Sequence, residues 1–269
     1  MRWDLFAILM IVPWFATWGG SLAANHMRID TARRQAGLLG FAAGVMIAAS
    51  VWSLILPAFD EVGATPRGAV VVSLGFLLGC AGMLLLDRVV PHQHPEEPRP
   101  EGHTSHLSRP MLLVLAVALH NIPEGLALGV VIAAAMGDSS MTWSAALMFG
   151  VGLALQNFPE GLAVVLPLRQ AGMSKKKCRR LGLLASLAEP GAAVLGLLFT
   201  SLLSSLGGVI LPLLLSAAAG AMVFIVVEEL IPESQAAGLS PDGRHSHAAT
   251  YGFLLGFWAM ALMGILGAG

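Results

Sequence analysis

Long apolar blocks alternate with short polar connections along the whole chain. Eight blocks are long enough to supply the roughly 20 helical residues that cross the hydrocarbon core of a bilayer. They lie at 4–25, 36–58, 67–90, 110–136, 142–169, 180–204, 207–231 and 248–268. Because they leave almost no residues for a soluble domain, the pattern predicts an all-α polytopic membrane protein with one transmembrane domain over residues 1–269.

Composition and charge placement agree with this pattern and orient the chain. Hydrophobic residues make up 56% of the sequence, charged residues 12%, and the mean hydropathy is +0.77, outside the range of soluble domains. With eight spans, every Lys and Arg except Arg2 and Arg67 falls in connections on one side. Since Lys and Arg remain in the cytoplasm, both termini should lie outside it, in the cell inner membrane. The basic run at 174–180 is then an anchor beside the lipid bilayer, with no nucleic acid as partner.

The first block could alternatively be a cleaved signal peptide, since it starts with Arg2 and ends in small residues. Asp4 cancels the charge at the amino end, however, and Arg33 and Arg34 follow the block as a cytoplasmic anchor. We therefore expect the first block to remain as a membrane span.

An eleven-residue motif occurs twice, as "ALHNIPEGLAL" at 118–128 and as "ALQNFPEGLAV" at 154–164. The two copies agree at eight positions. The polar residues stand at positions i, i+1 and i+4, so each helix presents one polar wedge. They are His120, Asn121 and Glu124 in the first copy and Gln156, Asn157 and Glu160 in the second.

Each copy of the motif also contains a proline, Pro123 or Pro159. A proline in a helix cannot donate the usual hydrogen bond, and it crowds the carbonyl group one turn earlier. At bilayer depth that carbonyl must be satisfied by protein, water or an ion, because lipid offers no donor. The carboxylate, the polar neighbours and the loosened carbonyl oxygen together predict a cation site.

A third pairing of glutamate with proline, Glu189 and Pro190, stands in the middle of the sixth block. Each carboxylate at mid-membrane costs about 2.5–3.5 kcal/mol on insertion scales, so three of them require cations or protons. Consecutive spans cross in opposite directions, so the repeated motif has inverted-repeat character, which is typical of transporters. We expect a mid-membrane metal site on the fourth, fifth and sixth helices. The alternative is that these glutamates are protonated or join helices by hydrogen bonds.

Two further groups of residues are candidates for an ion pathway. In the second block, Met46, Ser53 and Asp60 recur at seven-residue intervals and would line an outer vestibule. Met46 could instead serve packing alone. Glu228 and Glu229 stand near the cytoplasmic end of the seventh block, where they would mark an exit path or be ordinary interfacial charges.

The longest connection, at 91–109, is rich in Pro, Glu and His and has no apolar face to bury. We expect a flexible cytoplasmic loop. Its histidines are candidates for metal binding, and a plain solvated loop is the alternative. They are His92, His94, His103 and His106.

With HNIPEG, QNFPEG and AEPGA in its fourth, fifth and sixth blocks, the chain resembles the bacterial branch of the ZIP family (ZRT/IRT-like) of metal transporters. The resemblance implies a homodimer that moves Zn²⁺, and also Cd²⁺, Fe²⁺ or Mn²⁺, into the cytoplasm by an elevator-like or rocking motion. The metal is then a substrate, and no cofactor is needed. The implied main site comprises His120, Glu124, Gln156 and Glu160 with Met46 nearby, and the implied second site adds Asn121, Asn157 and Glu189 while sharing Glu124 and Glu160.

The chain departs from the family pattern at three places. Many relatives have His where Gln156 stands, relatives in this branch often have Asp at the position of Asn157, and some have a His-Glu pair in place of Glu228 and Glu229. An Asn in place of Asp removes one negative charge. The second site should therefore hold a divalent ion less strongly and could be auxiliary.

The ligand types restrict the metal and the activity. A histidine nitrogen with carboxylate and amide oxygens suits Zn²⁺, Cd²⁺, Fe²⁺ or Mn²⁺ better than Cu(I), Ca²⁺ or Mg²⁺. Because the ion must displace protons from the carboxylates, uptake should weaken at acid pH. We do not expect an enzyme, since an intramembrane metal-dependent hydrolase would need H-E-x-x-H or a comparable set. A divalent-cation channel, which differs from a carrier in gating, and an efflux direction remain alternatives.

Overall fold

The computed structural model describes residues 2–24, 26, 32–93, 99–137, 139–239 and 246–267. Within these ranges the chain is helical or irregular, with one isolated β-bridge between His92 and Glu101. The helices are α1 (Trp3–Ala23), α2 (Ala32–Ala49), η1 (Ser50–Ile55), α3 (Leu56–Val62), α4 (Pro66–Val89), α5 (Arg109–Met136), α6 (Trp143–Gln170), α7 (Lys175–Ser186), α8 (Ala188–Leu203), η2 (Ser204–Leu206), α9 (Ile210–Ile225), η3 (Val226–Leu230), α10 (Ile231–Ala237) and α11 (Ala248–Gly267).

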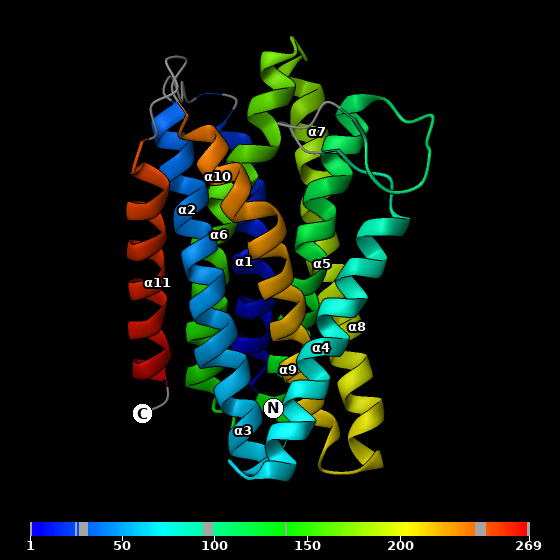
Figure 1. The fold of residues 1–269 in the computed structure, drawn as a ribbon, viewed down its shortest axis with the longest axis vertical. Helices are drawn as coiled ribbons and strands as arrows, with labels where there is room; N and C mark the ends of the chain where they lie inside the picture. Colours follow the sequence, from blue (N-terminus) through cyan, green and yellow to red (C-terminus); the bar gives the residue numbers. More distant parts are fainter. Residues whose placement is uncertain are drawn as a thin grey trace.

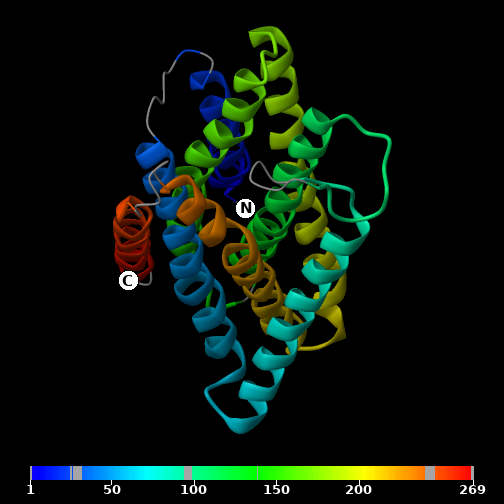
Figure 2. The same cartoon turned by 45° about the horizontal axis from the view of Figure 1, so that its top comes forward.

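Eight helical runs in the described ranges are long and apolar enough to cross a membrane, which confirms the predicted all-α, eight-span fold. Three of the runs combine several elements, namely α2 to α3, α7 to η2 and α9 to α10. In Figure 1 both termini lie toward the end of the molecule that carries α3. We call this end the termini side and the opposite end, which carries α7, the loop side. Figure 2 turns the loop side forward and shows residues 99–108, which lead into α5, on the opposite side of the molecule from α11.

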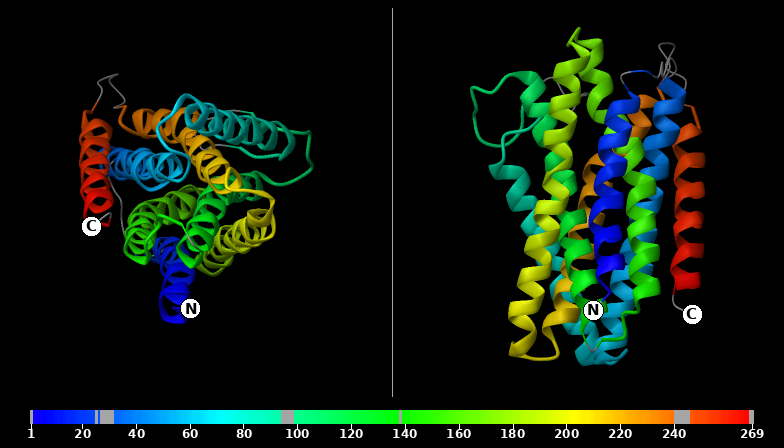
Figure 3. Two further views of the ribbon diagram at one scale, coloured as in Figure 1. Left: turned by 90° about the horizontal axis from the view of Figure 1, so that it is seen from below. Right: turned by 180° about the vertical axis from the view of Figure 1, so that it is seen from behind.

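The helices form two groups, visible as two rows in the left panel of Figure 3. The strongest pairings are α2 with α11 and α4 with α9 in one group, and α1 with α6 and α5 with α8 in the other. In all four pairs a glycine lets the helix backbones touch: an added Cβ at Gly44, Gly79, Gly161 or Gly125 would lie 2.1 Å or less from a carbonyl oxygen of the partner helix. Contact between the groups, as in α6 with α11, instead uses side chains such as Met260 against Gly152. Close backbone packing thus holds each of the four helix pairs together.

Two runs depart from regular α-helix where polar residues must be placed. The second run contains the π-helical turn η1, and the seventh contains the π-helical turn η3, which carries Glu228 and Glu229. Such turns often occur at functional sites because they re-aim side chains. The sixth run breaks at Leu187, since Pro190 has no N–H and crowds the carbonyl group of Ser186. Glu189 therefore lies in the first turn of α8.

Candidate metal-binding site

Helices α5 and α6 carry the two copies of the repeated motif, and both continue as helix through their prolines. All six polar residues of the two wedges are buried. The most exposed of them, His120, has 5% of its surface accessible. Their burial means that both wedges point into the protein, and not toward the lipid, where a carboxylate would be costly.

Hydrogen bonds bring the wedges and the sixth-run glutamate together. The Gln156 side-chain amide (Nε2) donates to Glu124 Oε1 over 2.6 Å and so joins α6 to α5. The Asn157 amide (Nδ2) donates to Glu189 Oε2 over 2.8 Å and joins α6 to α8. Three elements that are distant in sequence thus contribute to one buried polar cluster.

The two motif asparagines also bind backbone carbonyl oxygens of neighbouring helices. The Asn121 amide (Nδ2) donates over 3.0 Å to the carbonyl oxygen of Ala185 near the end of α7. The Asn157 amide (Nδ2) donates over 3.2 Å to the carbonyl oxygen of Pro13 in α1. These bonds fix the orientation of both amides and leave their oxygens directed elsewhere.

The glycine in each copy of the motif is required by close contact with a neighbouring helix. A Cβ on Gly125 would lie 2.1 Å from the carbonyl oxygen of Glu189, and one on Gly161 would lie 2.0 Å from the carbonyl oxygen of Thr17. Both distances are far below ordinary contact, so only glycine lets α8 and α1 approach the motif helices this closely. The glycines therefore set the distance between the wedges and the helices that complete the cluster.

The cluster contains an unusual excess of buried oxygens. Seven side-chain oxygens have no hydrogen-bond partner within the described residues, although they are shielded from solvent. They are Asn121 Oδ1, Glu124 Oε2, Gln156 Oε1, Asn157 Oδ1, Glu160 Oε1 and Oε2, and Glu189 Oε1. Each such atom costs about 1–3 kcal/mol if nothing satisfies it. A divalent cation accepts several oxygen ligands at once, so this donor set fits a metal ion.

His120 connects the cluster to the loop side. Its Nε2 contacts the carboxylate of Glu229, a buried residue of η3. A cavity of about 30 Å³, large enough for about one water molecule, is lined by His120, Glu160 and Glu233 together with apolar residues of α2, α5, α6 and η3. Because Leu113 near the start of α5 and Pro167 near the end of α6 also line it, the cavity lies on the loop side of the cluster.

The three residues expected along an outer vestibule lie in different surroundings. Met46 is completely buried within the main apolar cluster, Ser53 is buried in η1, and Asp60 is exposed on α3. The seven-residue spacing assumed a regular helix, and the π-helical turn between Met46 and Asp60 changes the register. Near the loop side, Glu228 is exposed whereas its neighbour Glu229 is buried.

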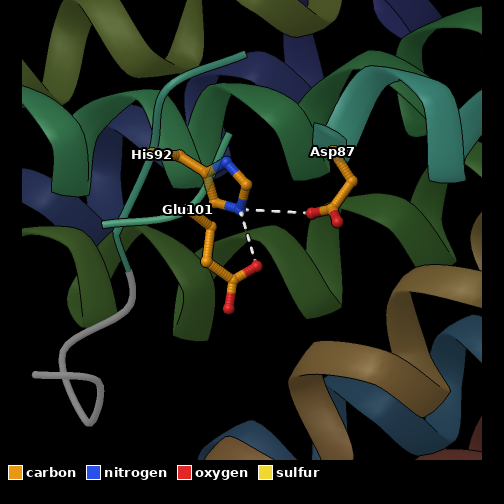
Figure 4. A group of neighbouring side chains, drawn as sticks. All are labelled: Asp87, His92 and Glu101. Atoms are coloured by element: carbon orange, nitrogen blue, oxygen red, sulfur yellow. Dashed lines mark ion pairs between the residues drawn. The ribbon is translucent and has the colours of Figure 1, made fainter. Parts of the chain in front are cut away.

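The loop histidines do not gather into one group within the described residues. His92 is completely buried and lies beside Asp87 and Glu101 (Figure 4). His103 and His106 are exposed. His94 lies outside the described residues.

Sequence reasoning missed three residues. Thr17 lies beside Glu189 from α1, and its local signal in the sequence is weak, since it only stands four residues after Pro13. Asp87 and Glu101 could not be paired with His92 from the sequence, because the contact depends on how the loop returns.

The comparisons with known proteins cover most of the chain. The family model described as "ZIP Zinc transporter" matches residues 92–264. The zinc transporter ZupT of Corynebacterium glutamicum is 36% identical, over 96% of this chain and 97% of its own length. The zinc transporter ZIPB of Bordetella bronchiseptica is 39% identical, over 92% of this chain and 76% of its own, and the human zinc transporter ZIP11 is 33% identical, over 91% and 93%. Each similarity includes the helices that carry the buried cluster.

Proposed function

Because the chain belongs to the ZIP zinc transporter family, we propose that it carries Zn²⁺ across a membrane through the buried cluster of α5, α6 and α8. The observation that carries this proposal is the set of seven buried oxygens without hydrogen-bond partners in the described residues. Cd²⁺, Fe²⁺ and Mn²⁺ have similar ligand preferences and should compete with Zn²⁺. The metal is the transported substrate.

The proposed main site uses Glu124 and Glu160 as its charged ligands, because together they balance one divalent ion. Gln156 occupies the position in the second wedge that His120 occupies in the first, and it contributes its side-chain oxygen. His120 would reach the ion after leaving Glu229. Met46 is proposed as a neighbour of this site.

The proposed second site uses the oxygens of Asn121, Asn157 and Glu189 and shares Glu124 and Glu160. With Glu189 as its only additional charge, this site balances a second divalent ion poorly. We therefore propose that its occupancy is low and that its role is auxiliary.

We propose that the loop side faces the cytoplasm. Within the described residues, the Lys and Arg side chains other than Arg2 and Arg67 belong to helix ends and connections on that side. The cavity beside His120 and Glu160 opens the cluster in that direction, so Glu229, Glu233 and then Glu228 would form the exit path. Ser53 and Asp60 would belong to the entry path from the termini side.

The two helix groups support an alternating-access mechanism. The proposed ligands belong to the group of α1, α5, α6 and α8, whereas Glu229 belongs to the other group. Movement of one group along the other would carry the ligands past Glu229 without separating the glycine-packed pairs. We also propose a homodimer in an inner membrane, which cross-linking of the protein in its native membrane would test.

The test is metal influx into liposomes that contain the purified protein and a fluorescent metal indicator. We expect saturable entry of Zn²⁺ and Cd²⁺, exclusion of Mg²⁺, loss of entry in Glu160→Ala and only weaker entry in Asp60→Ala. Equal loss in the two variants would contradict the assigned roles. Entry that does not saturate would favour a channel, and folded protein without metal flux would refute transport.

A further inference from the structure

A carboxylate outside the buried cluster joins the two helix groups at the termini side. Glu61 lies in α3, which packs against α4 and α9. Ser140 lies in the connection between α5 and α6, two helices of the other group. Glu61 Oε1 accepts two hydrogen bonds from Ser140, over 2.6 Å from its backbone N–H and over 2.7 Å from its hydroxyl group. Hydrogen bonds to a charged acceptor are about twice as strong as those between neutral groups.

The position of Glu61 is electrostatically unfavourable for a carboxylate without a partner. Glu61 stands one residue before the end of the helical run from Arg33 to Val62. Gly63 ends this run with a φ of 77°. The last carbonyl groups of a helix form the negative end of its dipole, which repels a carboxylate. The two donors of Ser140 offset this repulsion, so the contact stabilises the end of α3.

The connection between α5 and α6 is folded so that it presents Ser140. The hydroxyl group of Ser139 donates to the carbonyl oxygen of Ala134 over 2.8 Å, and its oxygen accepts from the N–H of Met141 over 3.1 Å. These bonds join the end of α5 to the residues before α6. The donors of Ser140 are therefore held at a fixed place, where Glu61 accepts both.

The same connection contacts the group of α2, α4, α9 and α11 a second time. Thr142 is the N-cap of α6, and its Oγ1 accepts from the N–H of Ala145 over 3.0 Å. The hydroxyl group of Thr142 also donates over 3.4 Å to the carbonyl oxygen of Gly267, at the end of α11. The connection is thus attached to both α3 and α11.

Apolar side chains close the protein between this connection and the buried cluster. Leu128 and Ile132 follow the glutamate of the motif in α5, and Phe149 and Leu153 precede the motif in α6. All four side chains are buried, with at most 1% of their surface exposed. The cavity beside His120 opens instead toward the loop side. The structure is therefore closed on the termini side.

We propose that Glu61 and Ser140 form a latch that holds the termini side closed and opens each time an ion enters from that side. This inference rests on the proposed transport by movement of one helix group along the other. Such movement carries the α5–α6 connection away from α3, so the two hydrogen bonds must break. A cavity of about 410 Å³ adjoins the latch and is lined by Glu61, Ser139 and the facing ends of α5, α8 and α9, which leaves room for the movement. The strength of the latch then sets the fraction of molecules that are open on the termini side.

Two substitutions weaken the latch from opposite sides. Glu61→Ala removes the acceptor, and Ser140→Ala removes one of the two donors without changing any charge. Only molecules open on the termini side accept an ion, so the KM of zinc uptake should fall, by about tenfold in Glu61→Ala and about threefold in Ser140→Ala. Asp60→Ala removes the neighbouring charge of the proposed entry path and should raise KM instead. Ser205→Ala removes an exposed hydroxyl group that bonds to Leu202 in the preceding turn, and it should leave KM unchanged.

A cross-link tests directly whether the latch must open. The two native cysteines are first removed as Cys80→Ser and Cys178→Ala. Glu61→Cys and Ser140→Cys are then added and bridged with a short bis-methanethiosulfonate reagent, which a reducing agent cleaves. Bridging should stop zinc uptake into liposomes, and reduction should restore it. Each single-cysteine variant, treated in the same way, should keep the uptake that it has without the reagent.

The outcomes separate the latch from transport itself. In metal-free protein, backbone hydrogen exchange of residues 139–142 should be faster in Glu61→Ala than in the unmodified chain, and this measurement requires no transport. The latch is wrong if that exchange is unchanged, if the bridged protein carries Zn²⁺ as fast as before bridging, or if KM does not fall in Ser140→Ala. Faster exchange in folded protein that carries no Zn²⁺ would support the contact and refute the transport proposal. Glu61 is half-buried and Ser140 is exposed, so both alanine variants should fold.

Discussion

The substitution Gly125→Ala tests whether backbone contact between α5 and α8 sets the geometry of the buried cluster. The added Cβ would lie 2.1 Å from the carbonyl oxygen of Glu189. A favourable contact needs about 3.5 Å, so the helices would have to separate by about 1.4 Å. Gly125 follows Glu124 directly, and the clash is with Glu189 itself. The two carboxylates would therefore move apart.

The effect on metal binding follows from the length of metal–ligand bonds. Bonds between zinc and oxygen tolerate changes of about 0.2 Å, so a shift larger than 1 Å removes a ligand. Because Glu124 is a ligand of both proposed sites, its displacement should lower zinc uptake by about tenfold to a hundredfold. Overpacking should also lower the free energy of unfolding by about 1–3 kcal/mol.

Zinc influx into liposomes and thermal unfolding in detergent measure the two effects, and two alanine substitutions serve as controls. Gly191→Ala lies two residues after Glu189 but would meet no atom within 4 Å, so transport should be unchanged and stability should not fall. Gly129→Ala would lie 2.1 Å from the carbonyl oxygen of Ala193, one turn further along the same interface. It should reproduce the loss of stability with a smaller loss of uptake. If Gly125→Ala transports as well as Gly129→Ala, contact between α5 and α8 does not position the ligands.

Three other changes test the proposed roles. Asn157→Asp removes the donor to Glu189 and Pro13 and adds a charge, so the metal-free protein should unfold at a lower temperature and gain more stability from Zn²⁺; an unchanged zinc-induced shift in Tm would contradict the second site. Glu229→Gln keeps a partner for His120 but removes the charge, so initial uptake should slow while equilibrium zinc binding persists; unchanged uptake would remove Glu229 from the exit path. Protons compete with the ion for the buried carboxylates, so uptake should be weaker at pH 5 than at pH 8, and a flat profile over that range would refute this competition.

Local patterns were sufficient to predict much of the fold. Each membrane span is encoded in a contiguous run of apolar residues, and the spacing of His120, Asn121 and Glu124 on a helix determines which side of the helix they share. The structure confirms eight spans, and it places the polar residues of both wedges inside the protein. These features depend only on residues within a few turns of one another.

The features that escaped prediction depend on departures from regular helix or on distant contacts. The π-helical turn at Ser50–Ile55 changes the register between Met46 and Asp60, and no pattern in the sequence predicted this turn. The approach of His120 to Glu229 requires two helix groups to meet, and the pairing of His92 with Glu101 requires the loop to return. Sequence spacing carries little information about either contact.

The contacts of the repeated motif show how the inverted repeat is built. The first motif helix uses Asn121 and Gly125, four residues apart, to contact the carbonyl oxygens of Ala185 and Glu189, which are also four apart. The second motif helix repeats this arrangement on α1, where Asn157 contacts the carbonyl of Pro13 and Gly161 that of Thr17.

Helix α1 therefore packs against α6 in the same way as the α7–α8 run packs against α5. The sequences of α1 and of the sixth run show no resemblance that would have predicted this. In this correspondence Thr17 occupies the position of Glu189. The backbone contacts are thus symmetric but the side chains are not, because only one of the two equivalent positions supplies a carboxylate. This asymmetry explains why the buried cluster has three glutamates and not four.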